Sequence, residues 1–154
     1  MTLRLSDVTG LLDGWYPPSK AESWDAGWEL GVRRTTSASL ERTWAHLLGP
    51  GLATWLGDTT LELTRGAPYA TPDGTTGEVR GHQHHRRLRL TWLPPDDEHE
   101  TTIQLTVQPV ATGTALSFLQ ERMRDPDERE RRLVHWTDVV ERLVRDLDAG
   151  ASRS

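Results

Sequence analysis

The segment from Asp125 to Leu147 constrains the fold more than any other part of the chain, because its pattern requires a partner surface. Apolar residues recur in it at steps of three and four, which places them on one stripe of an α-helix. This stripe consists of Leu133, Trp136, Val140, Leu143 and Leu147, with Val139 and Val144 at its margins. Charged residues occupy the other side, with Val134 as the exception. Such a helix spans roughly 33 Å, so the rest of the chain is expected to supply an apolar surface for it.

Both ends of this helix carry the expected signals. Asp125 is a favourable N-cap, Pro126 suits the first helical position, and Glu128 stands where a capping box places its acid. Gly150 follows the apolar stripe as a typical stop signal. The sequence therefore predicts a helix that ends before this glycine and a disordered tail over residues 149–154.

The start of the helix lies in a run of mixed charge over residues 122–132. Acids in the first turn are favoured by the helix dipole. We interpret the run as a solvated helix end with i,i+4 pairs such as Glu128–Arg132.

The composition fits one domain with one core. The chain has 154 residues, of which 35% are hydrophobic and seven are tryptophans, and each tryptophan can bury a large area. A net charge of −5 argues against nucleic-acid binding, which needs a clustered positive field. The lack of cysteine excludes disulfides and thiolate metal sites and fits a reducing compartment. No apolar run reaches the ~20 residues of a membrane span, and the first residues lack a signal core, so a cytoplasmic protein is predicted.

Alternating apolar and polar residues predict strands through the middle of the chain. The first strand spans Trp28 to Thr36, and a helix capped by Ser37 or Ser39 follows it. A second short helix carries Trp55. Further strands are predicted at residues 61–63, 75–82, 87–92, 102–107 and 116–118, with a loop over 65–72. Turns as short as those between the later strands favour antiparallel pairing, and the alternation indicates a sheet with one covered face. The sequence therefore predicts an α+β domain in which the C-terminal helix covers the sheet.

Four local patterns, taken in order, carry a family resemblance. They are Ser37 to Trp44 followed by Trp55-Leu56; Gly77-Glu78-Val79 leading to Arg87 to Trp92; Glu100 to Val107 closing with Gly113 to Leu116; and His135-Trp136. In this order and spacing the chain resembles bacterial SRPBCC proteins of the START/Bet-v-1-like superfamily, and among them the activator of Hsp90 ATPase homologue 1-like family. One segment departs from the family: the last strand exits with Gln120-Glu121-Arg122-Met123, without the histidine and glycine of the His-Glu-Gly-like segment that members often carry.

The resemblance implies a helix-grip fold, in which a curved antiparallel β-sheet wraps around a long C-terminal α-helix and two short helices follow the first strand. We predict that residues 27–148 form this domain. Residues 1–26 are interpreted as an N-terminal arm packed on it, with a partner-binding or dimerising segment as the alternative.

The resemblance also implies an apolar ligand cavity between the sheet and the long helix. The predicted lining is Trp55, Leu63, Tyr69, Leu90, Trp92, Leu105, Val107, Phe118, Trp136 and Val140. Tyr69, Glu78 and Arg80 are the candidate polar groups that orient a ligand. The alternative is an ordinary core, because Trp92, Phe118 and Trp136 are bulky enough to fill the space.

Two other signatures point to no site. On a strand, His82 and His84 share a face about 6–7 Å apart without a third ligand, and the adjacent Arg86 and Arg87 oppose a cation. The histidines are therefore interpreted as a solvated strand end or turn, with no metal or cofactor. The chain has no nucleophile elbow and no Gly-rich phosphate loop.

Three functions follow from this reading. The first is binding of a small apolar ligand without evident chemistry. The second is a co-chaperone-like or regulatory interaction module with a protein partner or as a homodimer. The third is a cyclase- or hydrolase-like enzyme that uses the cavity.

Overall fold

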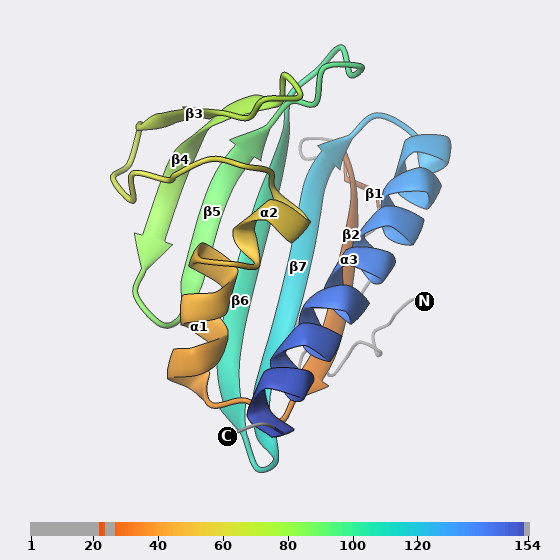
Figure 1. Cartoon of the computed structure of the whole chain (residues 1–154). Coiled ribbons are helices and arrows are strands. Elements are labelled where there is room, and N and C mark those ends of the chain that lie inside the picture. The colour runs from red at the N-terminus through yellow and green to blue at the C-terminus, as the bar shows by residue number, and fades with distance from the viewer. Residues whose placement is uncertain (1–21, 24–26, 153–154) are drawn as a thin grey trace.

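The computed structural model describes residues 22–23 and 27–152, and the side chains of residues 27–150. In chain order the elements are β1 (Glu22–Ser23), β2 (Gly27–Thr36), α1 (Leu40–Leu48), α2 (Leu52–Trp55), β3 (Pro68–Ala70), β4 (Thr76–Gln83), β5 (Arg87–Trp92), β6 (Thr101–Val110), β7 (Gly113–Met123) and α3 (Pro126–Ser152). The strands form one antiparallel sheet in the order β1-β2-β7-β6-β5-β4-β3. All three helices lie on the same face of this curved sheet (Figure 1). The predicted α+β helix-grip fold is confirmed.

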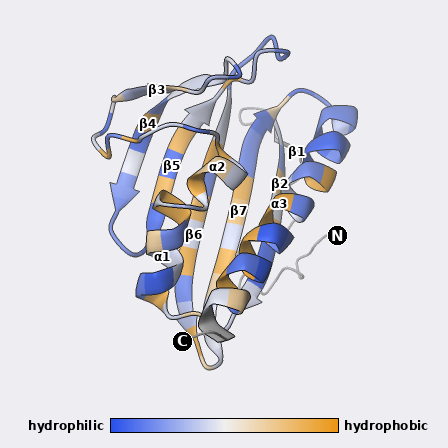
Figure 2. Ribbon diagram, viewed as in Figure 1, coloured by the Kyte–Doolittle hydropathy of each residue, from blue (hydrophilic) through white to orange (hydrophobic). Residues whose placement is uncertain are grey.

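The strand register shows which residues share the face of the sheet that the helices cover and which share the solvent-exposed face. Leu105 of β6 lies opposite Leu88 of β5 and Phe118 of β7, so three apolar side chains share the covered face. One residue earlier, Gln104 lies between Arg89 and Leu119 on the other face. Hydrophobic and hydrophilic residues alternate along the central strands (Figure 2). The alternation in the sequence thus predicts the faces of the central strands correctly.

The turn between β6 and β7 depends on a glycine. Gly113 has a φ of 149°, which disfavours any L side chain. A Cβ atom built there would lie 2.0 Å from the backbone oxygen of Thr36. Gly113 therefore allows the β6–β7 turn to approach the end of β2.

The two short helices follow their sequence signals. Ser39 caps α1, and its side chain accepts a hydrogen bond from the backbone N–H of Arg42 over 3.1 Å. Trp55 Nε1 of α2 donates to the backbone oxygen of Leu47 over 2.8 Å, which ties α2 to α1. Both helices bury apolar side chains against the sheet face that α3 also covers.

The start of α3 is a variant of the predicted capping box. Asp125 Oδ1 accepts from the Glu128 N–H over 2.8 Å, as expected of an N-cap. Glu128 Oε1 accepts from the N–H of Arg124, one residue before the cap, over 2.7 Å. The predicted pair between Glu128 and Arg132 is wrong, because Glu128 is buried and Arg132 binds Asp97 instead.

The end of α3 differs from the prediction. The helix continues through Gly150 to Ser152, into the segment interpreted as a tail. Arg42 Nη2 donates to the backbone oxygen of Leu147 over 2.8 Å. Asp148 accepts from the hydroxyl of Thr36 over 2.6 Å. These contacts with α1 and β2 hold the last turns in helical form, so glycine alone does not end the helix.

The segment between α2 and β4 was assigned wrongly. Leu61 and Leu63 belong to no strand, and β3 lies inside the segment 65–72 that was predicted as a loop. Two alternating leucines are too short a signal to select a strand. The place beside β4 is taken by Pro68 to Ala70, and the Tyr69 hydroxyl anchors them by donating to the Thr91 backbone oxygen over 2.6 Å. Of the predicted N-terminal arm, residues 1–21 and 24–26 lie outside the described residues. No helix in the described ranges is both long and apolar enough to cross a lipid bilayer.

Candidate ligand site

Aromatic rings from four elements meet between the sheet and α3. Phe118 of β7 stacks on Trp136 of α3 with ring centroids 5.1 Å apart. Trp92 of β5 approaches Trp136 at 5.4 Å, and Trp55 of α2 approaches Phe118 at 5.7 Å. All four residues are buried. We call these four residues the aromatic cluster.

The structure places nine of the ten predicted cavity residues in the buried core, and Leu63 packs against that core half-buried. The nine are Trp55, Tyr69, Leu90, Trp92, Leu105, Val107, Phe118, Trp136 and Val140. Alternation placed Leu90, Trp92, Leu105, Val107 and Phe118 on the inward face of their strands, and helical spacing placed Trp136 and Val140 on the apolar stripe of α3. That they line a ligand site stays a prediction.

Of the three predicted polar groups, one lies in the buried core and two lie at the protein surface. Tyr69 is buried, and its burial raises the pKa of its hydroxyl well above the ordinary value, with Glu100 adding to the effect. Glu78 and Arg80 bind each other over 2.6 Å with their side chains substantially exposed. They face water, so their prediction as cavity groups is wrong.

A polar chain within the core was missed. Trp136 Nε1 donates to Gln120 Oε1 over 2.7 Å, and Gln120 Nε2 donates to Thr101 Oγ1 over 3.0 Å. Gln120 follows Leu116 and Phe118 at steps of two on β7, so periodicity would have placed it inside. A glutamine that is 1% exposed among aromatic rings keeps its amide satisfied within the core.

A second polar group lies where α3 begins, against the loop between β5 and β6. Arg132 Nη2 binds Asp97 Oδ2 over 2.6 Å, and the guanidinium carbon lies 4.8 Å from the ring centroid of Trp92. His135 stacks on the same ring at 6.1 Å. Burial lowers the pKa of His135, and the charge of Arg132 lowers it further. Trp92, a member of the aromatic cluster, thus also contacts this charged group.

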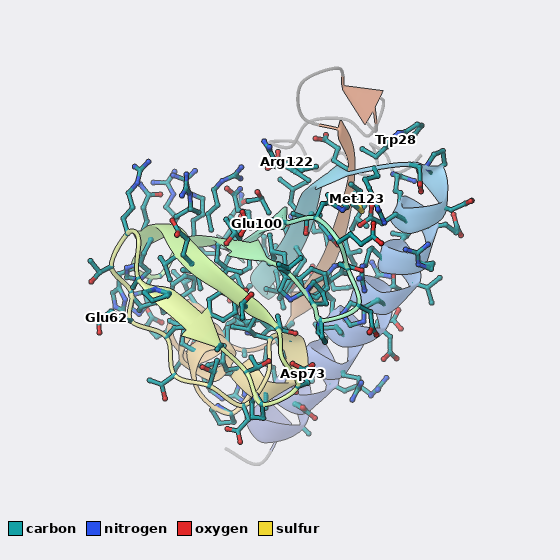
Figure 3. The ribbon with its side chains drawn as sticks, turned by 90° about the horizontal axis from the view of Figure 1, so that it is seen from above. Trp28, Glu62, Asp73, Glu100, Arg122 and Met123 are labelled. Carbon is teal, nitrogen blue, oxygen red and sulfur yellow. The ribbon has the colours of Figure 1, made fainter. Side chains whose placement is uncertain are left out.

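Glu128 extends this group by one turn of α3. Its carboxylate is 1% exposed, and Oε1 lies 3.6 Å from His99 Nε2 and 3.6 Å from Arg124 Nε. Seen from above, Trp28 and Met123 lie on the side of the sheet where α3 begins, and Glu62 lies on the opposite side of the molecule (Figure 3). Buried carboxylates with neighbouring basic side chains occur both in ion-pair networks that stabilise a fold and in functional sites.

The histidines of the β4–β5 turn form a separate group against α1. His82 stacks on Trp44 at 6.0 Å, and His84 stacks on His85 at 3.8 Å. His82 faces α1 because the register of β4 shifts between Val79 and Gly81, so the prediction of a fully solvated strand end is wrong for this residue. In the described part of the chain, no three potential ligand side chains come together as a metal ion would require.

A curved antiparallel sheet that grips a long C-terminal helix, with two short helices after the first long strand and an aromatic interior, defines a helix-grip protein. The family model described as activator of Hsp90 ATPase homolog 1-like protein matches residues 37–148. The chain belongs to this family of SRPBCC proteins.

Solved structures agree with the fold. Protein MLL2253 from Mesorhizobium loti has a TM-score of 0.68 at 23% identity, over 79% of this chain and 97% of that one. CalU16 from Micromonospora echinospora has a TM-score of 0.68 at 17% identity, over 82% of each chain. The Aha1 dimer from Colwellia psychrerythraea has a TM-score of 0.66 at 18% identity, over 79% of this chain and 97% of that one. No curated protein matches the chain.

Proposed function

We propose that this protein binds a small, mainly apolar and aromatic molecule between the sheet and α3, without catalysing a reaction. One observation carries the proposal: rings from four separate elements meet at one place in the interior, around a glutamine whose amide is already satisfied. Ligand sites commonly combine an apolar lining with a few fixed polar groups.

The arrangement of the rings favours a flat ligand. Phe118 and Trp136 are nearly parallel, with an interplanar angle of 23°. A flat molecule that separates them exchanges one stacking contact for two, which offsets the loss of the original one. Trp55 lies edge-on to Phe118 at 69° and closes one side of this place.

The test uses protein purified from its own host. Native mass spectrometry detects a retained molecule, and tryptophan fluorescence reports titration with a panel of lipids and aromatic metabolites. Phe118→Ala removes one wall and is expected to weaken the response at least tenfold. Trp44→Phe, in α1 outside the aromatic cluster, is the matched control and keeps the response. No retained mass together with no response to the panel would refute the proposal.

The family gives a second candidate, a regulatory interaction module. Its support is the description of the matching family as Hsp90 ATPase activator-like, together with the dimeric state of the Colwellia psychrerythraea neighbour. A module of this kind alters the ATPase rate of a bacterial Hsp90 or forms a homodimer. Unchanged ATPase rates and a monomeric mass by light scattering would count against it.

A further inference from the structure

Three buried polar atoms lack hydrogen-bond partners where the loop between β5 and β6 meets α3. They are Glu128 Oε2, His99 Nδ1 and Arg132 Nε, and within the described residues none of them has a partner. The Glu128 side chain is 1% exposed. Buried polar groups are nearly always paired, so three such atoms in one place indicate a missing occupant.

The contacts already present fix the chemistry of each free atom. His99 Nε2 lies 3.1 Å from the backbone oxygen of Arg122, which can only accept, so Nε2 carries a proton, and in the tautomer protonated at Nε2 alone Nδ1 is an acceptor. Glu128 uses Oε1 for the Arg124 N–H, so its Oε2 is a second acceptor. Arg132 Nε is a donor, because a guanidinium has no acceptor atom.

The residues that carry these three atoms are neighbours. Glu128 and Arg132 are four residues apart on α3 and therefore share a face. His99 Nε2 approaches Glu128 Oε1 at 3.6 Å, and Arg132 binds Asp97, two residues before His99. Trp92 lies under the Arg132 guanidinium and also contacts Trp136, so the cluster borders the aromatic cluster directly.

Two acceptors and one donor are complementary to a group with two N–H donors and one acceptor. We propose that this cluster binds the primary carboxamide of a ligand whose aromatic body lies against Trp92 and Trp136, which rests on the proposed function. The carboxamide NH₂ donates to Glu128 Oε2 and His99 Nδ1, and its oxygen accepts from Arg132 Nε. A carboxylate would be repelled by Glu128, and an ammonium group has no acceptor for Arg132.

The test titrates the full-length protein with matched probes, followed by ¹H–¹⁵N NMR. The probes are toluene, 4-methylbenzamide, its N,N-dimethyl derivative and 4-methylbenzoate. We expect 4-methylbenzamide to bind about tenfold or more tightly than the other three, because a site built for hydrogen bonds rejects analogues that cannot form them. Toluene binding reports on the apolar site alone.

The variants assign the preference to the cluster. Glu128→Gln keeps the oxygen that accepts from Arg124 but replaces Oε2 with a donor, so the preference for 4-methylbenzamide disappears while toluene still binds. His99→Phe removes the second acceptor and gives the same result if Glu128→Gln does not fold. Arg142→Gln, on the exposed side of α3, is the control and keeps the preference.

The outcomes separate the two proposals. If toluene binds but the four probes have similar affinities, the cluster holds an ordered water only and the carboxamide site is refuted. An unchanged preference in both Glu128→Gln and His99→Phe refutes it as well. If no probe binds, the apolar site itself is refuted, and the carboxamide site with it.

Discussion

The hydrogen bond between Trp136 and Gln120 allows the packing of the interior to be tested without a ligand. Trp136 Nε1 and Gln120 Oε1 are 2.7 Å apart, and both residues are 1% exposed. Trp136→Phe removes the donor and keeps an aromatic ring. Gln120→Leu removes the acceptor and keeps a similar volume. Each single variant leaves a buried polar atom unpaired, at about 1–3 kcal/mol.

The double variant removes both partners of this bond, so it leaves neither Trp136 Nε1 nor Gln120 Oε1 unpaired. The bond from Gln120 Nε2 to Thr101 Oγ1 is lost in Gln120→Leu and in the double variant alike, so its loss cancels in the comparison. The two single losses therefore add up to more than the loss in the double variant, by a coupling of about 1–2 kcal/mol. A single loss of about 2 kcal/mol lowers Tm by roughly 4–8 °C in a chain of this size.

Urea unfolding followed by far-ultraviolet circular dichroism measures these free energies, because Trp136→Phe alters tryptophan fluorescence. The control cycle uses Asp138→Asn and Arg142→Gln, an exposed i,i+4 pair on the same helix, with an expected coupling below about 0.5 kcal/mol. Losses in Trp136→Phe and Gln120→Leu that are additive within about 0.3 kcal/mol would show that the bond is not isolated in an apolar interior.

Three further predictions concern the edges of the domain. The hydrogen bond from Thr36 is the largest cause that lowers the pKa of Asp148, so Asp148→Asn is expected to be less stable than wild type at neutral pH. This difference in stability shrinks as the pH falls below about 4 and through the lowered pKa. Thermal melts that give the same difference in Tm at pH 7 and pH 3 would contradict this prediction. Gly113→Ala costs about 3 kcal/mol because its Cβ meets the Thr36 backbone oxygen, whereas Gly66→Ala, also at positive φ but with open space, costs about 1 kcal/mol, as urea titration can measure. Val134→Gln changes stability by less than about 0.5 kcal/mol if this 65% exposed side chain stays in water, and a larger loss in thermal melts would indicate that the predicted N-terminal arm covers it.

Periodicity predicted the elements in which one face is buried and the other is exposed to solvent. In β5 to β7 and in α3, long alternating or helical patterns left little choice, and the buried positions agree with them. The exposed Val134 was also predicted as the exception on α3. Local patterns failed where tertiary contacts decide, as in β3, which the Tyr69 hydrogen bond anchors, and at Gly150, where Arg42 and Asp148 support a longer helix.

The candidate site was predictable only in its apolar part. Gln120 was noticed as a departure from a family segment, but its hydrogen bond to Trp136 depends on how α3 packs across the sheet. Glu128 and Arg132 were predicted to belong to a solvated, charged helix end, and nothing was predicted for His99. Their burial follows from contacts between a loop and a helix turn about 30 residues apart, which no local pattern contains.

The position of α3 at the end of the fold has a consequence for synthesis. The ribosome completes the whole sheet before it begins the 27 residues of the helix that covers it. At about 5–20 residues per second, adding those residues takes roughly 1 to 5 s. During that interval the aromatic rings of β5 and β7 lack their partner Trp136, so the nascent sheet presents an apolar surface on which chaperones or other chains can bind.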